Sequence, residues 1–408
     1  MRRSVEARGR RPRLLVAITD PLSTVLLRGQ LAHARAAGFD VTLISGPGAR
    51  ARQLAAEEGV GLVEVPMVRE LSPLRDLVSL WRVFRVVRRL RPDLVNAGTA
   101  KAGLLVTAAA WLNGVPGRIY TMRGIRLETH RGFFRHLLWG VERLIGAMVH
   151  RVVCVSPSLR ARALQLGVVA PEKTLVLAGG SSNGVQVERF GAGANGPAAA
   201  RLRGELGLQG AGPVVGFVGR LVRDKGVREL AEAWSMLREE FPDARLLLVG
   251  PEESGDPVPS AVLQALREDA RVTLTGGVFD TAPYYLLMDM LVLPSYREGF
   301  PNVVLEAGAS GLPVVTTTVP GCVDAVEDGI TGLHVPAGDA RALSAALRRY
   351  LADPGLRRRH GDAGRARVNA EFRRERIWEG LIDLYREMVV ANTAAAGPAA
   401  RASPGELP

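Results

Sequence analysis

Residues 291–307, LVLPSYREGFPNVVLEA, decide the fold of this chain because they pass from a strand through a loop into a helix. Leu291–Leu293 is a short apolar run that is typical of a buried strand. Pro294 and Gly299 then mark a polar loop. Pro301 suits the first turn of a helix, so a helix is predicted to begin there and to carry Glu306 in its second turn. This strand–loop–helix unit is the building block of a parallel sheet covered by helices.

The same alternation extends in both directions along the chain. Strands are predicted at 14–18, 41–44, 62–65, 94–96, 118–121 and 152–155, and again at 214–218, 246–249, 272–275, 291–293, 314–316 and 332–335. Longer segments of helical period separate them, which indicates parallel sheets covered on both faces. The sequence therefore predicts an α/β chain with two doubly wound, Rossmann-like domains that face a cleft.

The small-residue composition after residue 178 suggests the domain boundary. We expect an N-terminal domain over 12–182, an interdomain linker over 183–212 and a C-terminal domain over 213–372. A final helix over 373–392 is expected to pack back on the first domain. The basic segment 1–11 and the Ala-, Gly- and Pro-rich segment 393–408 are expected to be disordered. The glycine pattern at 191–196 follows no predicted strand, so it is not interpreted as a dinucleotide-binding loop.

Composition excludes several classes of protein. The chain has 408 residues, of which 47% are hydrophobic, so it contains enough apolar residues to form cores. Its two cysteines, Cys154 and Cys322, support neither a disulfide framework nor a zinc site, and a reducing, cytoplasmic location is expected. The longest uncharged apolar run, 102–115, is shorter than the ~20 residues of a membrane-spanning helix.

Positive charge is concentrated in the first half of the chain. The net charge of the whole chain is +12, whereas residues 1–185 carry +16 and the remainder −4. Two segments, 73–91 and 132–151, combine arginines with Trp81 or Phe133 at helical spacing. Such helices can lie on an anionic membrane, although either could instead cover its own sheet. Nucleic acid is the weaker alternative because the chain has only 5% aromatic residues and no recognisable binding motif.

The loop and helix at 294–307 have the features of an anion site. The start of the helix, at Gly299, Phe300, Pro301 and Asn302, would present the positive end of its dipole and, except at Pro301, its backbone N–H groups to a phosphate. Glu298 and Glu306 lie on either side, and a carboxylate can accept hydrogen bonds from vicinal hydroxyls. One could hold a ribose and the other a sugar. Alternatively, Glu298 caps the helix and Glu306 is a solvated helical residue.

A second loop, 219–226, follows the first predicted strand of the C-terminal half and contains Gly219, Arg220 and Lys225. Its two cations could neutralise a diphosphate leaving group. Ordinary surface charges are the alternative for this pair. Both loops would lie at the same edge of the sheet.

These motifs together resemble the retaining glycosyltransferases of family four, which have the GT-B fold. The resemblance rests on Glu298-x7-Glu306, the Gly219-Arg220…Lys225 loop, Leu293-Pro294-Ser295 and Asn183-Gly184-Val185, and it covers about residues 13–390. The N-terminal motifs at 97–104, 114–116, 120–124 and 180–185 resemble the capsular and exopolysaccharide subgroup. Enzymes of that subgroup extend a sugar carried on a polyprenyl diphosphate at the inner membrane face.

The resemblance implies roles for individual residues. Arg220 and Lys225 would contact the donor diphosphate, Glu298 the transferred sugar and Glu306 the ribose. The domain over 12–182 would bind the acceptor and the domain over 213–372 the nucleotide sugar. The donor site would also include Asn183, and the acceptor side would include Thr19, Asp20 and Arg123. His130 is added to the acceptor side because it follows Arg123 in a predicted loop. Two departures stand out on the acceptor side: Thr19-Asp20-Pro21 replaces the glycine-rich loop of many relatives, and Arg123 stands where many have a histidine.

No metal or other cofactor is expected. The sequence contains no Asp-x-Asp pair and no HExxH, so metal-independent chemistry is the consistent interpretation. The resemblance implies a nucleoside diphosphate sugar as donor, with UDP favoured. The expected function is transfer of a hexosyl or N-acetylhexosaminyl group to a polyprenyl-linked glycan at the membrane. The alternatives are a transferase with a soluble acceptor, a GT-B sugar epimerase and a non-catalytic nucleotide-sugar-binding assembly protein.

Overall fold

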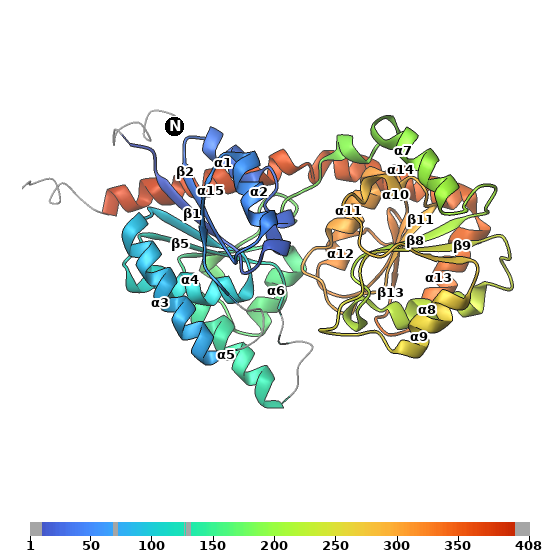
Figure 1. The fold of residues 1–408 in the computed structure, drawn as a ribbon, viewed down its shortest axis with the longest axis horizontal. Coiled ribbons are helices and arrows are strands. Elements are labelled where there is room, and N and C mark those ends of the chain that lie inside the picture. The colour runs from blue at the N-terminus through green and yellow to red at the C-terminus, as the bar shows by residue number, and fades with distance from the viewer. Residues whose placement is uncertain (1–9, 68–71, 126, 128–131, 396–408) are drawn as a thin grey trace, which may run out of the picture. The chain divides into compact units, whose positions relative to one another are not determined.

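The computed structural model describes residues 10–67, 72–125, 127 and 132–395. The chain divides into two compact units (Figure 1). The first comprises the described residues up to Cys154, Ala163–Leu177 and those from Trp378 onward. The second comprises Val155–Arg162 and Ala178–Ile377. The chain therefore returns to its first unit after completing the second.

The first unit is built on a seven-stranded parallel sheet in the order β3-β2-β1-β4-β5-β6-β7. Its strands are β1 (Arg13–Ala17), β2 (Asp40–Ser45), β3 (Gly61–Glu64), β4 (Leu94–Ala97), β5 (Gly117–Met122), β6 (Arg151–Cys154) and β7 (Thr174–Leu175). Its helices are α1 (Gln30–Ala36), α2 (Ala49–Glu58), α3 (Pro73–Leu90), α4 (Ala100–Leu112) and α5 (Gly132–Met148), while α6 (Pro157–Gln165) is divided between the two units.

Alternate residues of β1 enter two different cores. Leu14 and Val16 belong to a cluster with α1 and with α15 (Arg374–Ala395), whereas Leu15 and Ala17 belong to a cluster with α3 and α4. Both faces of the sheet are thus covered, which explains why its strands read as continuous apolar runs. In α15, Leu381, Tyr385, Met388 and neighbouring residues join the first cluster, so the C-terminal helix packs on the sheet of the first unit.

The second unit contains a six-stranded parallel sheet in the order β10-β9-β8-β11-β12-β13. Its strands are β8 (Val214–Val218), β9 (Arg245–Val249), β10 (Val272–Leu274), β11 (Met290–Leu293), β12 (Val314–Thr317) and β13 (Gly332–Val335). Its helices are α7 (Ala192–Glu205), α8 (Val227–Leu237), α9 (Ser260–Glu268), α10 (Ala282–Tyr285), α11 (Asn302–Ala309), α12 (Cys322–Ala325), α13 (Ala340–Ala352) and α14 (Pro354–Glu371).

The structure confirms two Rossmann-like α/β domains, and each predicted strand is present to within one residue at either end. One strand was missed: β7 has only two residues, too few to produce a pattern. The order of the second sheet repeats that of the first, if β8 is matched to β1 and β11 to β4.

The region expected to be a linker, 183–212, differs from the expectation. Residues 192–205 form α7, which packs on α10 and belongs to the second unit. The alanines at 198–200 and Leu202 favour a helix, and their effect exceeds that of the glycines before them. The glycine pattern 191–196 thus leads into α7.

The two expected terminal tails lie mostly outside the described residues. Arg10, inside the expected N-terminal tail, forms an ion pair with Asp93 at 3.0 Å. At the other end, α15 extends to Ala395, slightly past the predicted end of the C-terminal helix.

Candidate active site

The order of strands reverses between β8 and β11, and the two loops with the predicted donor residues leave the carboxyl ends of these strands. Open parallel sheets bind ligands at such a switch point. The loops are in contact, because the Tyr296 amide donates to the Asp224 carbonyl at 2.9 Å and Arg297 pairs with Asp224 at 2.7 Å. A Cβ on Gly226 would lie 2.1 Å from the Pro294 carbonyl oxygen, so only glycine allows this approach.

The structure joins two of the predicted catalytic residues directly. Lys225 Nζ forms an ion pair and hydrogen bond with Glu298 Oε1. The Lys225 side chain is 19% exposed and the Glu298 side chain 11%, so the pair is partly shielded from water. Ser295 also donates to Glu298 Oε1, at 2.8 Å. A cation and a carboxylate from different loops therefore meet at the switch point, with a buried hydroxyl fixing the carboxylate.

Arg220 is oriented differently from Lys225. Its guanidinium pairs with Glu253, which follows β9, and its side chain is 43% exposed. The structure places Arg220 immediately after Gly219 in the same loop as Lys225 but shows no contact between Arg220 and Glu298 among the described residues. Arg220 is thus near the switch point but engaged with a neighbouring loop.

The helix after the loop begins one residue later than predicted. Pro301 is the N-cap of α11, which starts at Asn302, because its ψ of 106° is extended and not helical. The Gly299 carbonyl oxygen packs closely against Gly321, because a Cβ added to Gly321 would lie only 2.4 Å from that oxygen. The Phe300 ring is buried and packs against Phe372, with ring centroids 5.3 Å apart. These contacts fix the backbone at the amino end of α11.

Asn302 connects this helix to the segment around residue 181. The Ser181 hydroxyl lies 3.4 Å from Asn302 Oδ1, and it accepts a hydrogen bond from the Gly184 amide at 3.0 Å. Asn183, between them, is buried. The predicted donor residues Asn183 and Asn302 therefore lie in one connected region of the second unit.

Glu306 on α11 is held by a residue that the sequence analysis did not identify. The Tyr285 hydroxyl donates to Glu306 Oε2 at 2.7 Å, and the Tyr285 ring is completely buried. Burial raises the pKa of Glu306, whereas the hydrogen bond from Tyr285 opposes that rise. Ser295, which bonds to Glu298, was also missed. No spacing rule links these hydroxyls to the carboxylates, although Ser295 is the last residue of the Leu293-Pro294-Ser295 motif.

The predicted acceptor residues lie at the equivalent edge of the first unit. Thr19 follows β1, and its hydroxyl lies 2.6 Å from that of Thr99, which follows β4. Asp20 caps the next turn by accepting from the Leu22 amide at 2.9 Å. Arg123, after β5, donates to the Gly98 carbonyl, and burial lowers its pKa to about 10, so it stays charged at neutral pH. His130 lies outside the described residues.

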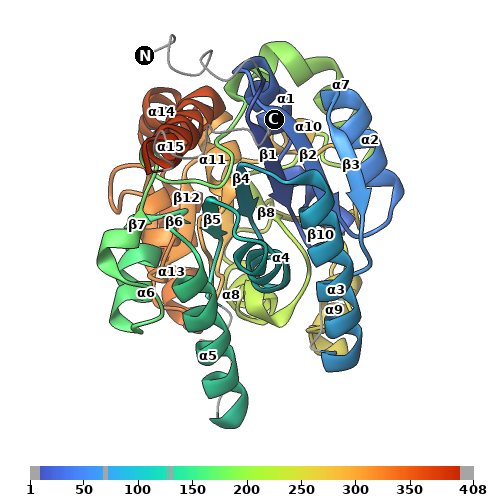
Figure 2. The same ribbon diagram turned by 90° about the vertical axis from the view of Figure 1, so that its left-hand side faces the viewer.

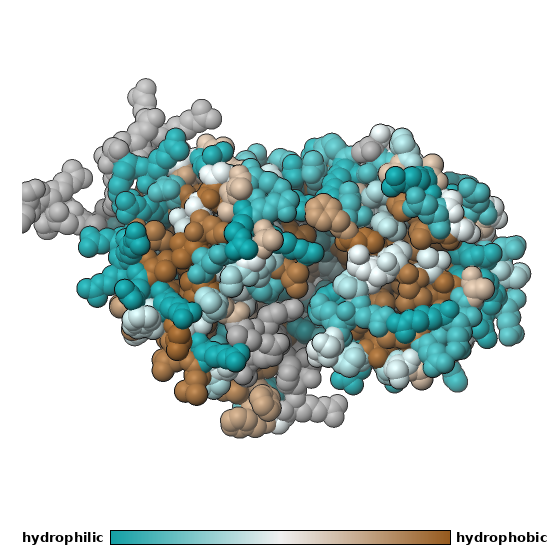
Figure 3. Space-filling view, in the orientation of Figure 1, coloured by the Kyte–Doolittle hydropathy of each residue, from teal (hydrophilic) through white to brown (hydrophobic). Residues whose placement is uncertain are grey.

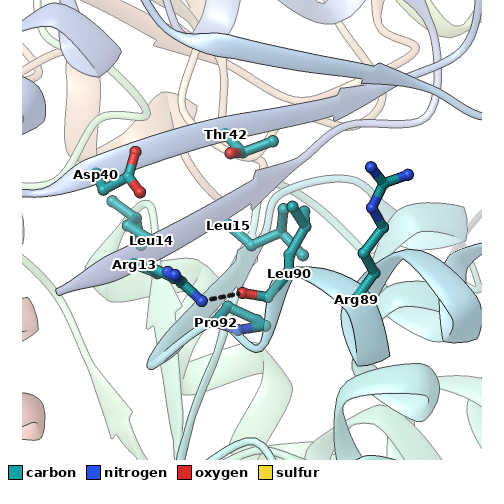
Figure 4. Close-up of a pocket in the computed structure, with 8 residues that line it drawn as sticks. All are labelled: Arg13, Leu14, Leu15, Asp40, Thr42, Arg89, Leu90 and Pro92. Carbon is teal, nitrogen blue, oxygen red and sulfur yellow. Dashed lines mark hydrogen bonds between the residues drawn. The ribbon is translucent and has the colours of Figure 1, made fainter.

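The structure shows no metal centre in its described part, since no three His, Cys, Asp or Glu side chains there come together in a way that could hold an ion. A pocket of about 230 Å³ lies at the other edge of the first sheet (Figure 4), where Arg13 and Asp40 begin β1 and β2. Arg13 donates there to the Leu90 carbonyl at 2.9 Å. Because ligands of parallel sheets bind at the carboxyl ends, this pocket is separate from the candidate site.

Comparison with known proteins identifies the family. Residues 212–353 match the family described as glycosyl transferases group 1, and residues 23–180 match the glycosyl transferase 4-like domain. The capsular polysaccharide biosynthesis glycosyltransferase CapM of Staphylococcus aureus is 34% identical over 369 residues, 90% of this chain and 95% of CapM. This chain belongs to the group 1 glycosyl transferases.

Two further similarities bear on this glycosyltransferase. An Escherichia coli protein named UDP-Gal:alpha-D-GlcNAc-diphosphoundecaprenol alpha-1,3-galactosyltransferase is 28% identical, covering 86% of this chain and 90% of its own. The structure of HepE from Anabaena with UDP and glucose superposes with a TM-score of 0.77 at 18% identity, covering 92% of this chain and all of HepE. The resemblance predicted from the motifs is thus confirmed at the level of family and fold.

Proposed function

We propose that this glycosyltransferase moves a hexosyl or N-acetylhexosaminyl group from a nucleoside diphosphate sugar, with UDP favoured, to a polyprenyl-diphosphate-linked glycan in cell-surface polysaccharide synthesis. The observation that carries the donor side is the meeting of Lys225 and Glu298 at the switch point of the second sheet. The acceptor class is supported by two relatives, one named for capsule synthesis and one named for a diphosphoundecaprenol-linked acceptor.

The donor residues divide the work between charge and hydroxyl recognition. Lys225 and Arg220 stabilise the negative charge that grows on the diphosphate as the bond to the sugar breaks. Glu298 accepts hydrogen bonds from hydroxyls of the transferred sugar, and Glu306 accepts them from the ribose. The amino end of α11, with Gly299, contributes backbone N–H groups to a phosphate. Neither a metal ion nor another cofactor enters this scheme.

The transfer proceeds with retention of the anomeric configuration. The bond between the anomeric carbon and the diphosphate oxygen breaks, and the acceptor hydroxyl oxygen bonds to that carbon from the same face. The hydroxyl proton passes to the departing diphosphate, which serves as the base. Lys225 must therefore shift from Glu298 towards the diphosphate when the donor binds.

The acceptor side is assigned to the carboxyl edge of the first sheet. Thr19 and Asp20 follow β1, and Arg123 offers a charge for an anionic acceptor group such as a diphosphate. His130 is retained as an acceptor-side residue because of its position in the sequence, shortly after Arg123.

We place the protein in the cytoplasm, bound peripherally to the inner face of the cell membrane. Within the described residues, no helix is long and apolar enough to span a bilayer. The membrane contact is supported by the +16 charge of residues 1–185 and by exposed apolar side chains on α3 and α5, including Trp81 at 56% and Phe133 at 77%. An anionic lipid surface attracts such a combination.

The decisive experiment incubates the purified protein and a lipid-linked acceptor with a panel of nucleotide sugars and measures released nucleotide and glycosylated lipid. We expect one donor to be used, with a product of retained configuration. Release of nucleotide without a glycolipid product would contradict the proposed acceptor, and no release with any donor would contradict the function.

A further inference from the structure

Two helices of the first unit, α3 and α5, have exposed apolar side chains at their amino-terminal ends, and both ends lie at the same edge of the sheet. α3 follows β3 and α5 follows β5, and both run antiparallel to their strands, so both begin at the carboxyl edge. α4 lies between them and contacts both. The carboxyl edge is also where Thr19 and Arg123 lie, so the two helix ends and the proposed acceptor residues share one side of the unit.

The exposed stripe of α3 changes character along its length. Its amino-terminal half exposes Leu74 at 83%, Leu77 at 65% and Trp81 at 56%. These residues follow helical spacing, so they form one stripe, while Val83 and Val87 face the core. Leu77 and Trp81 therefore do not cover the sheet, whereas Phe84 and Val87, farther along the helix, pack on its core.

The amino-terminal half also exposes Arg75, whereas the carboxyl-terminal half exposes mainly arginines. Arg82, Arg85, Arg88 and Arg89 are all exposed, and within the described residues none of them lies within ion-pair distance of a carboxylate. Together with Arg91 and Trp81 they line a groove of about 730 Å³ beside β3. Arg85 stacks over the Trp81 ring at 4.7 Å. Arg82, the first of these arginines, lies ~12 Å along the helix axis from Leu74, at ~1.5 Å per residue.

The amino-terminal end of α5 projects from the unit (Figure 2). Residues 132–137 are exposed on every side of the helix, and Phe133 and Phe134 are 77% and 55% exposed. Farther along, the exposed Arg143 donates to the Gly167 carbonyl at 2.9 Å. Apolar side chains gather at this end of the unit in Figure 3. Both helices thus place apolar side chains at the carboxyl edge, with Arg75 and Arg135 among them, and on α3 four further arginines lie nearer the amino edge.

We infer that the first unit docks on an anionic lipid bilayer by inserting the amino-terminal ends of α3 and α5, with the α3 arginines at the level of the lipid phosphates. Charge complementarity selects this partner, because exposed arginines beside an apolar end match the phosphate layer above the acyl chains. The inference rests on the proposed function for its acceptor, since it brings the Thr19 edge to the surface that holds a lipid-linked substrate.

Vesicle co-sedimentation without substrates tests the docking. The wild-type protein should bind vesicles that contain phosphatidylglycerol and should not bind pure phosphatidylcholine. Phe133→Ser with Phe134→Ser should lower the partition coefficient about tenfold or more at low and high salt alike. Arg82, Arg85, Arg88 and Arg89 changed together to Gln should cost about fivefold per arginine at low salt and less as salt rises.

Matched variants in the second unit control for general effects of lost charge and apolar area. Phe279→Ser removes a ring that is 83% exposed, and Arg341, Arg349, Arg358 and Arg359 changed together to Gln remove four exposed charges. These variants should bind vesicles like the wild type. Equal losses in the two sets, or wild-type binding by the Phe133/Phe134 variant, would overturn the inference.

A depth measurement tests which part inserts. Phe134→Cys and Arg89→Cys each carry an environment-sensitive dye, and the two native cysteines are buried. A quencher placed on the lipid chains should quench the dye at position 134 more strongly than that at 89. Equal quenching would mean that the helices lie flat, which would overturn the insertion of their ends.

The outcomes for docking and for function can be separated with a short-chain, water-soluble acceptor. The Phe133/Phe134 variant should retain transfer to this acceptor while losing vesicle binding. Transfer by a wild-type protein that never binds vesicles would overturn the docking and leave the proposed function intact. Vesicle binding in the expected pattern without transfer from any nucleotide sugar would support the docking and contradict the function.

Discussion

Tyr285→Phe removes one hydroxyl from the candidate nucleotide site and leaves the ring in place. The hydroxyl donates to Glu306 Oε2 at 2.7 Å, and the ring is buried edge-on against Phe190 with centroids 5.6 Å apart. Phenylalanine preserves that packing, so the change tests the hydrogen bond alone. Glu306 is expected to keep its position on α11 but to lose the donor that stabilises its charged form.

The direction of the effect follows from the electrostatics. Burial already raises the pKa of Glu306 above its ordinary value of 4.5, and the Tyr285 hydrogen bond holds the rise in check. A carboxyl whose pKa is higher in the folded chain keeps its proton to higher pH. Stability is therefore lost as pH rises from 4.5 through the folded pKa. Without the Tyr285 hydroxyl, the pKa of Glu306 rises further, so the pH range over which stability is lost extends to higher pH.

Binding of the nucleotide should shift in the same direction. The ribose hydroxyls need an ionised Glu306 as acceptor, so the pH at which affinity is lost should move upward in Tyr285→Phe. A hydrogen bond to a charged group contributes about 1.5–3 kcal/mol. At pH values below the pKa of Glu306, affinity for the nucleotide should thus fall about tenfold to a hundredfold. Well above that pKa, affinity should change little because the free and the nucleotide-bound protein both lose the hydrogen bond from Tyr285.

Isothermal titration of the nucleoside diphosphate over a pH series measures this shift. Tyr284→Phe is the matched control, because Tyr284 is the adjacent tyrosine on α10 and shows no contact with Glu306 among the described residues. An affinity loss of the same size at every pH, or a pH profile identical to that of the control, would refute the assignment of Tyr285 as the residue that positions Glu306.

Four further outcomes are expected. Lys225→Ala should reduce turnover more than donor affinity, by about 2.7–4 kcal/mol of barrier, and stopped-time assays that show unchanged turnover would exclude its role at the leaving group. Transfer should survive excess EDTA, and chelator-sensitive activity rescued by magnesium would contradict metal-independent chemistry. Glu306→Gln should weaken binding of the free nucleoside diphosphate while Glu298→Gln should not, and calorimetry that finds equal losses would contradict the division of roles. Gly250→Ala should lower the melting temperature, because its Cβ would lie 1.9 Å from the Gly219 carbonyl oxygen, and a scan that finds no change would show that the two loops can separate.

The strands could be predicted because both faces of each sheet are buried. Leu14–Ala17 enters two cores in alternation, so every position must be apolar and the run is conspicuous in the sequence. β7 consists of Thr174 and Leu175 at the end of the sheet and has no such constraint. α7 was misjudged because glycines and a proline dominate its first turns, while its packing on α10 depends on distant residues.

The sequence predicts which loops carry the candidate site, but it does not predict most of the contacts between distant residues within it. Glu298 and Glu306 are positioned by a single loop and helix, so their spacing carries information. The hydrogen bond of Tyr285 to Glu306 spans 21 residues, and the pairing of Arg220 with Glu253 spans 33. Contacts between such distant residues depend on which strands lie next to each other in the sheet. Local sequence patterns do not encode the strand order.

The strand order explains why the chemistry gathers where it does. Lys225 and Glu298 are 73 residues apart in sequence, yet they meet because β8 and β11 are neighbours at the point where the order reverses. Thr19 and Thr99, 80 residues apart, meet at the matching point between β1 and β4. The two positions are equivalent in topology but differ in chemistry. The second sheet offers a cation and a carboxylate, which suit a charged diphosphate and a hydroxylated sugar. The first offers paired hydroxyls and a charged arginine, which agrees with the proposal that the two units bind different substrates of one transfer.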